Sequence, residues 1–469
     1  MRGFKNSSRL CVLVIIILLH FGVWCNGDAE NMSAQMEKNE INSLYSTIQG
    51  FVGKWWNGSD LYPDPCGWTP IQGVSCDLFD GFWYVTDLNI GPIHDNSLSC
   101  APSVEFSSNI FTLKHLRSLS FFNCFVSPRH HPTSIPTERW EFLASSLESL
   151  EFRSNPGLIG QIPNTFGRLI KLQSLVLVEN GLSGEIPQNL GDLVNLKRLV
   201  LAGNKLTGKI PDTFGRFDQL LICDLSRNKL SGVLPKQLFR GLISLLKLDL
   251  SYNNLQGEIP QEISQLKNLT LLDLSNNKLS SGLPKSIQEM TCLEELVLSN
   301  NPMGGFLDVL DWYNMIKLTT LDLSNMNLTG EIPKSIVELK KLRFLGLNDN
   351  KLNGKIPKNL EDLPNVSAIY LYGNNLTGEL QFSQWFYRKM GRRFGAWGNQ
   401  NLCYSYGLVS TIDVPFGVKQ CEQELKFVID VEMNSSFVDF QSSMGYLNDC
   451  WILRCFVVEL FMVILLLLK

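Results

Sequence analysis

Leucine, isoleucine and asparagine recur along most of this chain in the order L-x-x-L-x-L-x-x-N. Twelve segments fit the pattern in register and end at Ile93, Cys124, Asn155, Asn180, Asn204, Asn228, Asn253, Asn277, Asn301, Met326, Asn350 and Asn374. From Asn155 to Asn374 the step between copies is always 24 or 25 residues. A fixed period in this range is typical of a solenoid, in which each repeat forms one coil.

The pattern also predicts the structure of a coil. The apolar first, fourth and sixth positions point inward and the residues between them point to solvent, as in a short strand. Stacked strands then form a parallel sheet on the concave side, which makes the chain an α/β solenoid of about twelve repeats. The asparagine amide satisfies buried backbone groups of adjacent coils. Because methionine has no amide, we expect a local defect at Met326.

Apolar spacing outside the repeats predicts short capping helices, which an open solenoid needs because its ends expose leucines. Before the first copy, helical intervals separate Ile41, Leu44, Ile48, Phe51 and Trp55. After the last copy, a short helix is expected within Phe382–Phe394. The first two steps between copies are each 31 residues long. We expect their extra residues, including Ser127–Pro136, to project as loops.

Most of the asparagines are followed by a second motif, L-x-G-x-I-P. It occurs in Gly160–Pro163, Gly184–Pro187, Gly208–Pro211, Gly232–Pro235, Gly257–Pro260, Gly330–Pro333 and Gly354–Pro357. This continuation resembles the plant-specific class of leucine-rich repeats, over roughly Val85–Leu380. The resemblance implies a second strand in each coil and a right-handed superhelix. It also implies a host that is a cell-surface receptor or an extracellular inhibitor.

Paired cysteines flank the repeats. The string D-P-C-G-W…G-V-S-C, which contains Cys66 and Cys76, is similar to the N-terminal cap of plant leucine-rich-repeat ectodomains. That resemblance implies that these cysteines pair and that Trp68 covers the first coil. G-N-Q-N-L-C, ending at Cys403 and followed by Cys421, resembles the paired-cysteine C-terminal cap of the same family. With its apolar tail, the layout looks most like the Piriformospora indica-insensitive protein branch of plant receptor-like proteins.

The other cysteines of the repeat region are open to more than one interpretation. Cys100 and Cys124 either form a third disulfide, or Cys124 takes the place of the asparagine as a thiol. Cys223 and Cys292 fall on or near leucine positions and are expected to be buried thiols.

Both ends of the chain carry apolar runs. The basic start and the run Leu10–Leu19 indicate a secretory signal that is cleaved near Gly27. The run Phe456–Leu468 is shorter than a membrane span and suits a glycosylphosphatidylinositol-anchor signal better than a marginal transmembrane tail or a soluble product. The chain is thus divided into a signal peptide (1–27), an N-terminal cap (28–84), the repeats (85–380), a C-terminal cap (381–421), a spacer (422–450) and an apolar tail (451–469).

Glycosylation sequons agree with a secreted chain, in which disulfides also persist. The sequons of the mature chain begin at Asn31, Asn57, Asn268, Asn327, Asn365, Asn375 and Asn434. Membrane attachment through the tail would place the protein on the extracellular side of the plasma membrane.

Residues that depart from the repeat consensus on the concave face are the binding candidates. One predicted patch is apolar and consists of Val176, Val178, Val200 and Ala202. The other is aromatic and polar, and consists of Arg343, Phe344, Asn348, Tyr370 and Tyr372. Aromatic and arginine side chains are frequent energetic hot spots in interfaces. Asp224, Asp249, Asp273 and Asp322 form a column that either binds cations or a basic peptide, or is ordinary consensus.

Charge and motifs exclude several classes of function. The net charge of −4 gives no basic surface for nucleic acid. We find no nucleotide-binding or zinc-protease motif, and His130–His131 is expected to be a solvated pair rather than a metal site. We therefore expect no enzyme, metal or cofactor. The expected function is a receptor-like protein without a kinase, which binds a peptide or protein and acts with a membrane receptor kinase, in defence or in response to a fungus. The alternative is an extracellular inhibitor of a microbial wall-degrading enzyme.

Overall fold

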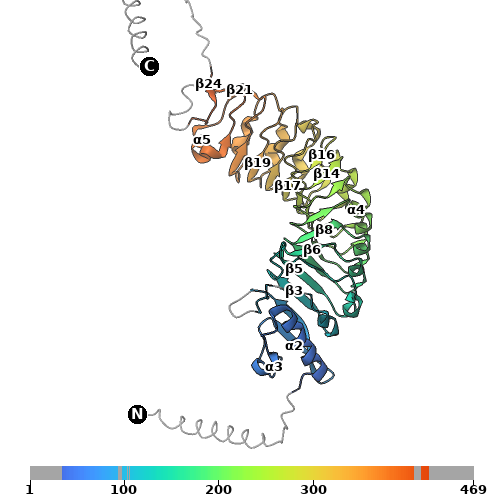
Figure 1. Ribbon diagram of the computed structural model, residues 1–469. Helices are drawn as coiled ribbons and strands as arrows, with labels where there is room; N and C mark the ends of the chain where they lie inside the picture. Colours follow the sequence, from blue (N-terminus) through green and yellow to red (C-terminus); the bar gives the residue numbers. More distant parts are fainter. Residues whose placement is uncertain (1–33, 93–97, 103, 105, 406–413, 422–469) are drawn as a thin grey trace, which may run out of the picture. The chain divides into compact units, whose positions relative to one another are not determined.

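The computed structural model describes residues 34–92, 98–102, 104, 106–405 and 414–421. The predicted signal peptide, spacer and apolar tail lie outside these residues, as do Asn31 and Asn434. Successive coils stack along the chain from the N-terminal helices to the C-terminal cap (Figure 1). The predicted α/β solenoid with disulfide-bearing caps is confirmed.

A long sheet runs through the stack, and its strands are parallel except for the first pair. Its strands are β1 (Val74–Phe79), β2 (Phe82–Ile90), β3 (Ser118–Phe122), β5 (Ser149–Arg153), β7 (Ser174–Val178), β9 (Arg198–Val200), β11 (Ile222–Asp224), β13 (Lys247–Asp249), β15 (Leu271–Asp273), β17 (Glu295–Val297), β18 (Thr320–Asp322), β19 (Phe344–Gly346), β20 (Ala368–Tyr370) and β22 (Phe394–Gly395). Strands β2 to β20 coincide with the twelve predicted segments. The leucines of each strand form one continuous core; Leu172, Leu175 and Leu177, for example, are fully buried.

The resemblance implied a second strand in each coil, but the motifs at Gly330–Pro333 and Gly354–Pro357 form only isolated bridges. In most other coils, shorter parallel strands are present, many of them with L-x-G-x-I-P residues. These are β4 (Thr133–Ser134), β6 (Leu158–Gly160), β8 (Gly181–Glu185) and β10 (Lys205–Thr207) in one sheet, β12 (Ser231–Gly232), β14 (Asn254–Gly257) and β16 (Lys278–Leu279) in a second, and β21 (Thr377–Leu380), β23 (Asn401–Tyr404) and β24 (Lys419–Gln420) in a third. Strand β4 corrects a prediction, because Ser127–Pro136 was expected to be a loop. Its residues Thr133 and Ser134 pair with Leu158 and Ile159.

Most helices are single turns that complete a coil. The helices of the described residues are the 3-10 helices η1 (Ser108–Thr112), η2 (Trp140–Leu143), η3 (Asn164–Arg168), η4 (Gln188–Asp192), η5 (Asp212–Arg216), η6 (Gln261–Gln265), η7 (Lys285–Glu289), η8 (Leu307–Val309), η9 (Trp312–Asn314), η10 (Lys334–Glu338), η11 (Lys358–Asp362) and η12 (Gly391–Arg393), and the α-helices α2 (Lys38–Val52), α3 (Gly58–Leu61), α4 (Lys236–Gly241) and α5 (Gln384–Met390). Proline commonly precedes the turn, as Pro187 does at φ −63° and ψ 133°. Its restricted φ favours a helix start at the next residue.

The asparagines form the expected ladder between coils. Asn253 is typical: its Nδ2 donates to the carbonyls of Leu225, Leu250 and Ser251, while its Oδ1 accepts from the amide of Leu230. Each amide thereby joins neighbouring coils and leaves no buried backbone group unpaired there.

The ladder is interrupted at Met326, as expected. The methionine is fully buried and contributes apolar contacts to the core, but its side chain donates no hydrogen bond to the ladder. In the preceding coil the amide of Met303 has no side-chain acceptor at position 326 and donates instead to the carbonyl of Asn301, at 2.8 Å. The defect is therefore a rerouted backbone hydrogen bond.

Helix α2 and strand β1 cap the N-terminal end of the stack. Leu44, Ile48 and Phe51 of α2 are fully buried, and the rings of Phe51 and Phe121 lie 4.7 Å apart. Strand β1 pairs with β2 and so covers the edge of the long sheet, which would otherwise expose unpaired backbone groups. The cap therefore covers the core and adds an antiparallel edge strand to the sheet.

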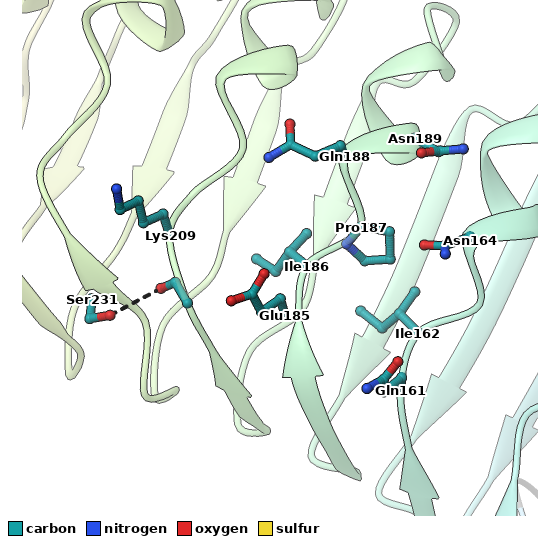
Figure 2. Close-up of a pocket in the computed structure, with 11 residues that line it drawn as sticks. Gln161, Ile162, Asn164, Glu185, Ile186, Pro187, Gln188, Asn189, Lys209 and Ser231 are labelled. Carbon is teal, nitrogen blue, oxygen red and sulfur yellow. Dashed lines mark hydrogen bonds between the residues drawn. The ribbon is translucent and has the colours of Figure 1, made fainter.

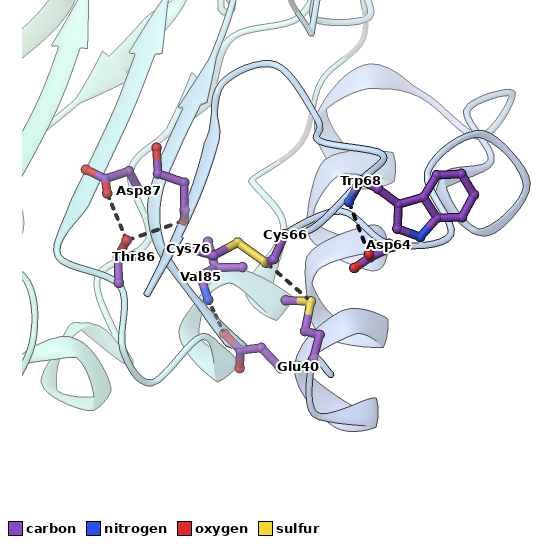
Figure 3. Close-up of a disulfide and its surroundings, with 10 residues drawn as sticks. Glu40, Asp64, Cys66, Trp68, Cys76, Val85, Thr86 and Asp87 are labelled. Carbon is purple, nitrogen blue, oxygen red and sulfur yellow. Dashed lines mark hydrogen bonds between the residues drawn. A yellow bond between two sulfur atoms is a disulfide. The ribbon is translucent and has the colours of Figure 1, made fainter. Parts of the chain in front are cut away.

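Two tryptophan predictions in this cap are wrong. Trp68 is 79% exposed and points away from the disulfide (Figure 3), so it does not cover the first coil. Trp55 is 76% exposed because α2 ends at Val52, which breaks the helical phase; Trp56 is buried in its place. Aromatic rings Tyr45 and Tyr62 lie next to Trp56, with centroids 6.0 and 6.2 Å away.

The structure resolves the cysteine alternatives. Disulfides join Cys66 to Cys76, Cys403 to Cys421, and Cys100 to Cys124. Among the free cysteines, Cys223 is buried as predicted. Cys292 is half-exposed, which corrects the prediction: it lies in the turn before a strand, and the Lys317 ammonium donates to its sulfur at 3.5 Å.

Candidate binding surface on the concave face

In-register pairing of parallel strands places the same repeat position of successive coils side by side. One such row runs through Asp224, Asp249, Asp273, Val297, Asp322, Gly346, Tyr370 and Gly395. The row is acidic in the middle coils and changes at Gly346. Beyond that point the concave face becomes aromatic.

The aspartates of this row are largely engaged in their own coils. The Asp249 carboxylate accepts from the amide of Ser251 at 2.9 Å, and Asp273 accepts from Ser275 in the same way. Burial raises the pKa of both carboxyls, neighbouring aspartates raise it further, and the serine hydrogen bonds oppose the shift. Within the described residues no group of acidic, histidine or cysteine side chains is arranged to hold a metal. The interpretation as repeat consensus accounts for this column.

Five rings form a continuous line at the C-terminal end of the concave face, and we call them the aromatic strip. Ring centroids are 5.8 Å apart for Phe344 and Tyr370, 6.0 Å for Tyr370 and Tyr372, 4.3 Å for Tyr372 and Trp397, and 5.7 Å for Trp397 and Phe416. The Tyr372 and Trp397 rings are stacked, with 4° between their planes. The first three rings were predicted; Trp397 and Phe416 were not.

Glycines make room for these rings. A Cβ at Gly395 would lie 2.7 Å from the Trp397 ring and 3.1 Å from the Tyr372 ring. A Cβ at Gly346 would lie 3.0 Å from the Phe344 ring. A Cβ at either position would crowd a ring, so the missing side chains allow the rings to lie against the backbone of the sheet.

Charged groups border the aromatic strip on two sides. Arg343 is exposed, and the guanidinium of Arg392 lies 5.6 Å from the centroid of Phe416. Asn348 donates from Nδ2 to the carboxylate of Asp349 at 2.8 Å. Partial burial raises the pKa of Tyr372, with smaller contributions from Asp349, Tyr370 and Asp322, so the phenol is neutral and can donate or accept a hydrogen bond.

The predicted apolar patch is present but is already covered. Val176 is fully buried, and Val200 and Ala202 are only 8% and 7% exposed. Val178 packs against them as a partly buried neighbour. The patch sits beside an ion-pair network in which Glu151 lies 2.8 Å from Arg153 and 3.8 Å from Arg198. These valines hold adjacent coils together and offer little surface to a ligand.

Other predicted positions are on the surface. His130 and His131 are exposed. The sequon asparagines within the described residues are exposed too, namely Asn57, Asn268, Asn327, Asn365 and Asn375. None of these asparagines belongs to the aromatic strip.

The missed ring Trp397 belongs to a thirteenth coil. Strand β22 pairs with β20, and Asn399 continues the ladder by donating to the carbonyls of Leu371 and Ala396. Asn399 follows Asn374 by 25 residues, so the period alone could have revealed this coil. Its leucine positions are occupied by Phe394 and Ala396, which hid it from the leucine pattern.

Comparison with known proteins agrees with this architecture. Two family models described as leucine rich repeat match the chain, one over residues 194–255, 224–279 and 257–303 and the other over 171–193, 317–339 and 341–363. Piriformospora indica-insensitive protein 2 of Arabidopsis thaliana is 58% identical over 174 residues, which are 36% of this chain and 40% of that protein. Receptor like protein 29 of the same plant is 36% identical over 182 residues, 38% of this chain and 37% of that protein.

A solved structure extends the likeness to a ligand complex. The structure of the plant peptide hormone receptor RGFR1 in complex with RGF2 has a TM-score of 0.56 and 30% sequence identity, and covers 64% of this chain and 46% of that chain. The matches span less than half the length of each of these relatives. The chain is a leucine-rich-repeat protein, and over the matched segments it is similar to plant receptor-like proteins. Within that class it resembles the Piriformospora indica-insensitive branch.

Proposed function

We propose that this chain is a cell-surface receptor-like protein that binds a peptide or protein with the aromatic strip and acts with a membrane receptor kinase. The observation that carries the proposal is the continuous line of rings from Phe344 to Phe416. In the coils that form this line, glycine and tyrosine occupy the row position that is aspartate in most of the middle coils. The likeness to a plant peptide hormone receptor supports it.

The mechanism is binding to a surface that is formed in advance. The strip rests on paired strands and stacked rings, so a ligand would lose little free energy to rearrangement of the protein. Aromatic rings supply apolar contact area, and Arg343 and Arg392 supply hydrogen bonds at its borders. No step of this kind requires a catalytic group, a metal or a cofactor.

The place of action follows from the same proposal. Three disulfides suit an oxidising compartment. No helix among the described residues is long and apolar enough to cross a membrane, and the apolar tail is proposed to be a lipid-anchor signal. Release from membranes by phosphatidylinositol-specific phospholipase C would support the anchor. The anchor would be contradicted if the protein is found in the soluble secreted fraction and neither the phospholipase nor alkaline carbonate changes its fractionation.

A response to a fungus is the biological role that the named relative suggests. Affinity capture with the intact ectodomain from plant membranes, before and after fungal exposure, tests the ligand and the kinase partner together. The double variant Tyr370→Ala/Tyr372→Ala should capture neither, whereas Phe142→Ala, which removes an exposed ring of η2 away from the strip, should capture both. Equal capture by the two variants would remove the strip from consideration. Inhibition of a microbial wall-degrading enzyme by the intact ectodomain would favour the inhibitor function instead.

A further inference from the structure

Two hollows that share lining residues lie beside the L-x-G-x-I-P segments of the coils, and Figure 2 shows the larger of the two. Their volumes are about 710 and 430 Å³, and both are lined by Gln188 and Lys209. Together they extend from Gln161 to Pro260, across the first five copies of the motif. We call this feature the flank groove.

The flank groove has an apolar floor and a polar rim. Ile162, Ile186 and Ile210 form part of the floor and are 2–3% exposed. Gln161, Glu185 and Lys209 occupy the variable position of successive motifs on the rim, and all three are exposed. Within the described residues, none of these three side chains has a hydrogen-bond partner in the protein. They are therefore available to a ligand.

Glycines set the direction of all three rim side chains. A Cβ at Gly184 would lie 2.9 Å from Cγ of Gln161, a Cβ at Gly208 would lie 2.8 Å from Cγ of Glu185, and a Cβ at Gly232 would lie 2.9 Å from Cγ of Lys209. Each side chain thus lies over the glycine of the next coil, at a φ that glycine readily adopts. The polar ends are consequently arranged along the groove, at intervals set by the coil spacing of about 4.8 Å.

The lining points to a neutral, hydroxyl-rich ligand. Its carboxylates Glu185, Asp212 and Glu258 are nearly balanced by the ammonium groups of Lys209 and Lys236. Amides and the Ser231 hydroxyl both donate and accept hydrogen bonds, as sugar hydroxyls do. No aromatic ring lines either hollow. Hydrogen bonds over a strip of C–H surface would therefore supply the affinity.

Two further observations disfavour a peptide strand and leave the groove accessible. Strand addition needs an unpaired sheet edge, but the amide of Ser231 donates to the carbonyl of Gly208 at 2.7 Å and joins the two side sheets. No sequon begins between Asn57 and Asn268, so no sequon asparagine lies within the segment from Gln161 to Pro260 that lines the groove.

We propose that the flank groove binds a neutral oligosaccharide chain, laid across successive coils, in addition to the ligand of the aromatic strip. Sugar hydroxyls bond to Gln161, Glu185 and Lys209, while C–H faces rest on the exposed side chain of Val233. The affinity is modest, with a dissociation constant of about 1 mM for a hexamer, because no ring stacking contributes.

The test uses the full ectodomain and cellohexaose, a neutral glucose hexamer, with saturation-transfer NMR. The variant Glu185→Ala/Lys209→Ala should weaken binding about tenfold, and Gln188→Trp, which fills the part shared by both hollows, should abolish it. The matched control is Glu331→Ala/Lys355→Ala, which alters the same motif position in coils outside the groove. This control should bind as the unaltered protein does.

Three results would overturn the proposal. They are no saturation transfer with the unaltered protein at several millimolar sugar, equal loss in the control variant, and preference for an anionic galacturonate hexamer. Capture through the aromatic strip depends on Tyr370 and Tyr372, so failure of one site is distinguishable from failure of the other.

Discussion

The indole ring of Trp397 lies parallel to the phenol ring of Tyr372, with 4.3 Å between their centroids. Tyr372 belongs to the last coil with a leucine pattern, whereas Trp397 belongs to the coil that leads into the C-terminal cap. Gly417 packs against Trp397, since a Cβ at position 417 would lie 2.7 Å from the tryptophan Cβ. The cap thus completes the aromatic surface as well as closing the core.

This stacking predicts that Trp397 contributes to ligand binding as strongly as the predicted tyrosines. Trp397→Ala should weaken binding of the captured ligand by about 2 kcal/mol, or roughly thirtyfold, as expected for a central aromatic residue. Titration calorimetry with that ligand measures the change, and Phe142→Ala serves as the control. An affinity within twofold of the unaltered protein would show that the surface ends at Tyr372.

The asparagine ladder predicts a large stability loss for a small change. Asn253→Ala removes three donated hydrogen bonds and one accepted bond inside the stack. The free energy of unfolding should fall by about 2–4 kcal/mol, since buried backbone groups lose their partners. Asn359→Ala, at an exposed helix position, should change it by less than about 0.5 kcal/mol. Urea unfolding of both variants provides the comparison, and similar midpoints would contradict the role of the ladder.

Glu40 predicts a pH dependence of the N-terminal cap. Glu40 is 4% exposed, and its carboxylate accepts from the amide of Val85 at 3.3 Å (Figure 3). Burial raises the pKa of Glu40 from 4.5 to about 7. The unfolded chain therefore ionises at lower pH than the folded protein. As pH rises from about 4.5 to about 7, the free energy of unfolding should fall by about 3 kcal/mol.

Glu40→Gln removes this titration and keeps an acceptor for Val85. Its stability relative to the unaltered protein should therefore rise across the same pH range and level off above pH 7. Thermal unfolding between pH 4 and pH 8 measures the difference, with the exposed Glu138→Gln as a control for the lost charge. Parallel stability curves for Glu40→Gln and the unaltered protein would be inconsistent with a buried neutral carboxyl.

The Cys403–Cys421 disulfide closes a separation of 18 residues and is adjacent to the strand pair β23–β24. The variant Cys403→Ala/Cys421→Ala should destabilise this cap by about 2–3 kcal/mol. Hydrogen exchange should become faster at the backbone amide of residue 421, which donates to the carbonyl of Tyr404 in the unaltered protein. Cys292→Ser, which alters a free cysteine, leaves that exchange unchanged. Slow exchange in the double variant would mean that strand pairing alone holds the cap.

The repeat fold was predictable from the sequence to a large extent. Leucine and asparagine at a fixed period define the inward positions and the ladder, because these depend on local geometry that every coil repeats. The cap disulfides and the positions of Tyr370 and Tyr372 on the concave face were also predicted. Burial was predicted wrongly where the helical spacing ended, as at Trp55, because residues beyond the end of helix α2 at Val52 no longer follow that spacing.

Other features were decided only when coils packed against one another. Alternation along a strand cannot reveal that Val176 is buried by its neighbours, or that Trp397 and Phe416 continue the strip. The sequence by itself determined the repeated coil, because its periodicity is local and each copy has the same pattern of leucine and asparagine positions. The tertiary structure decided which side chains share a surface, because contacts between coils join residues about 25 positions apart and depend on the side chain present in each neighbour.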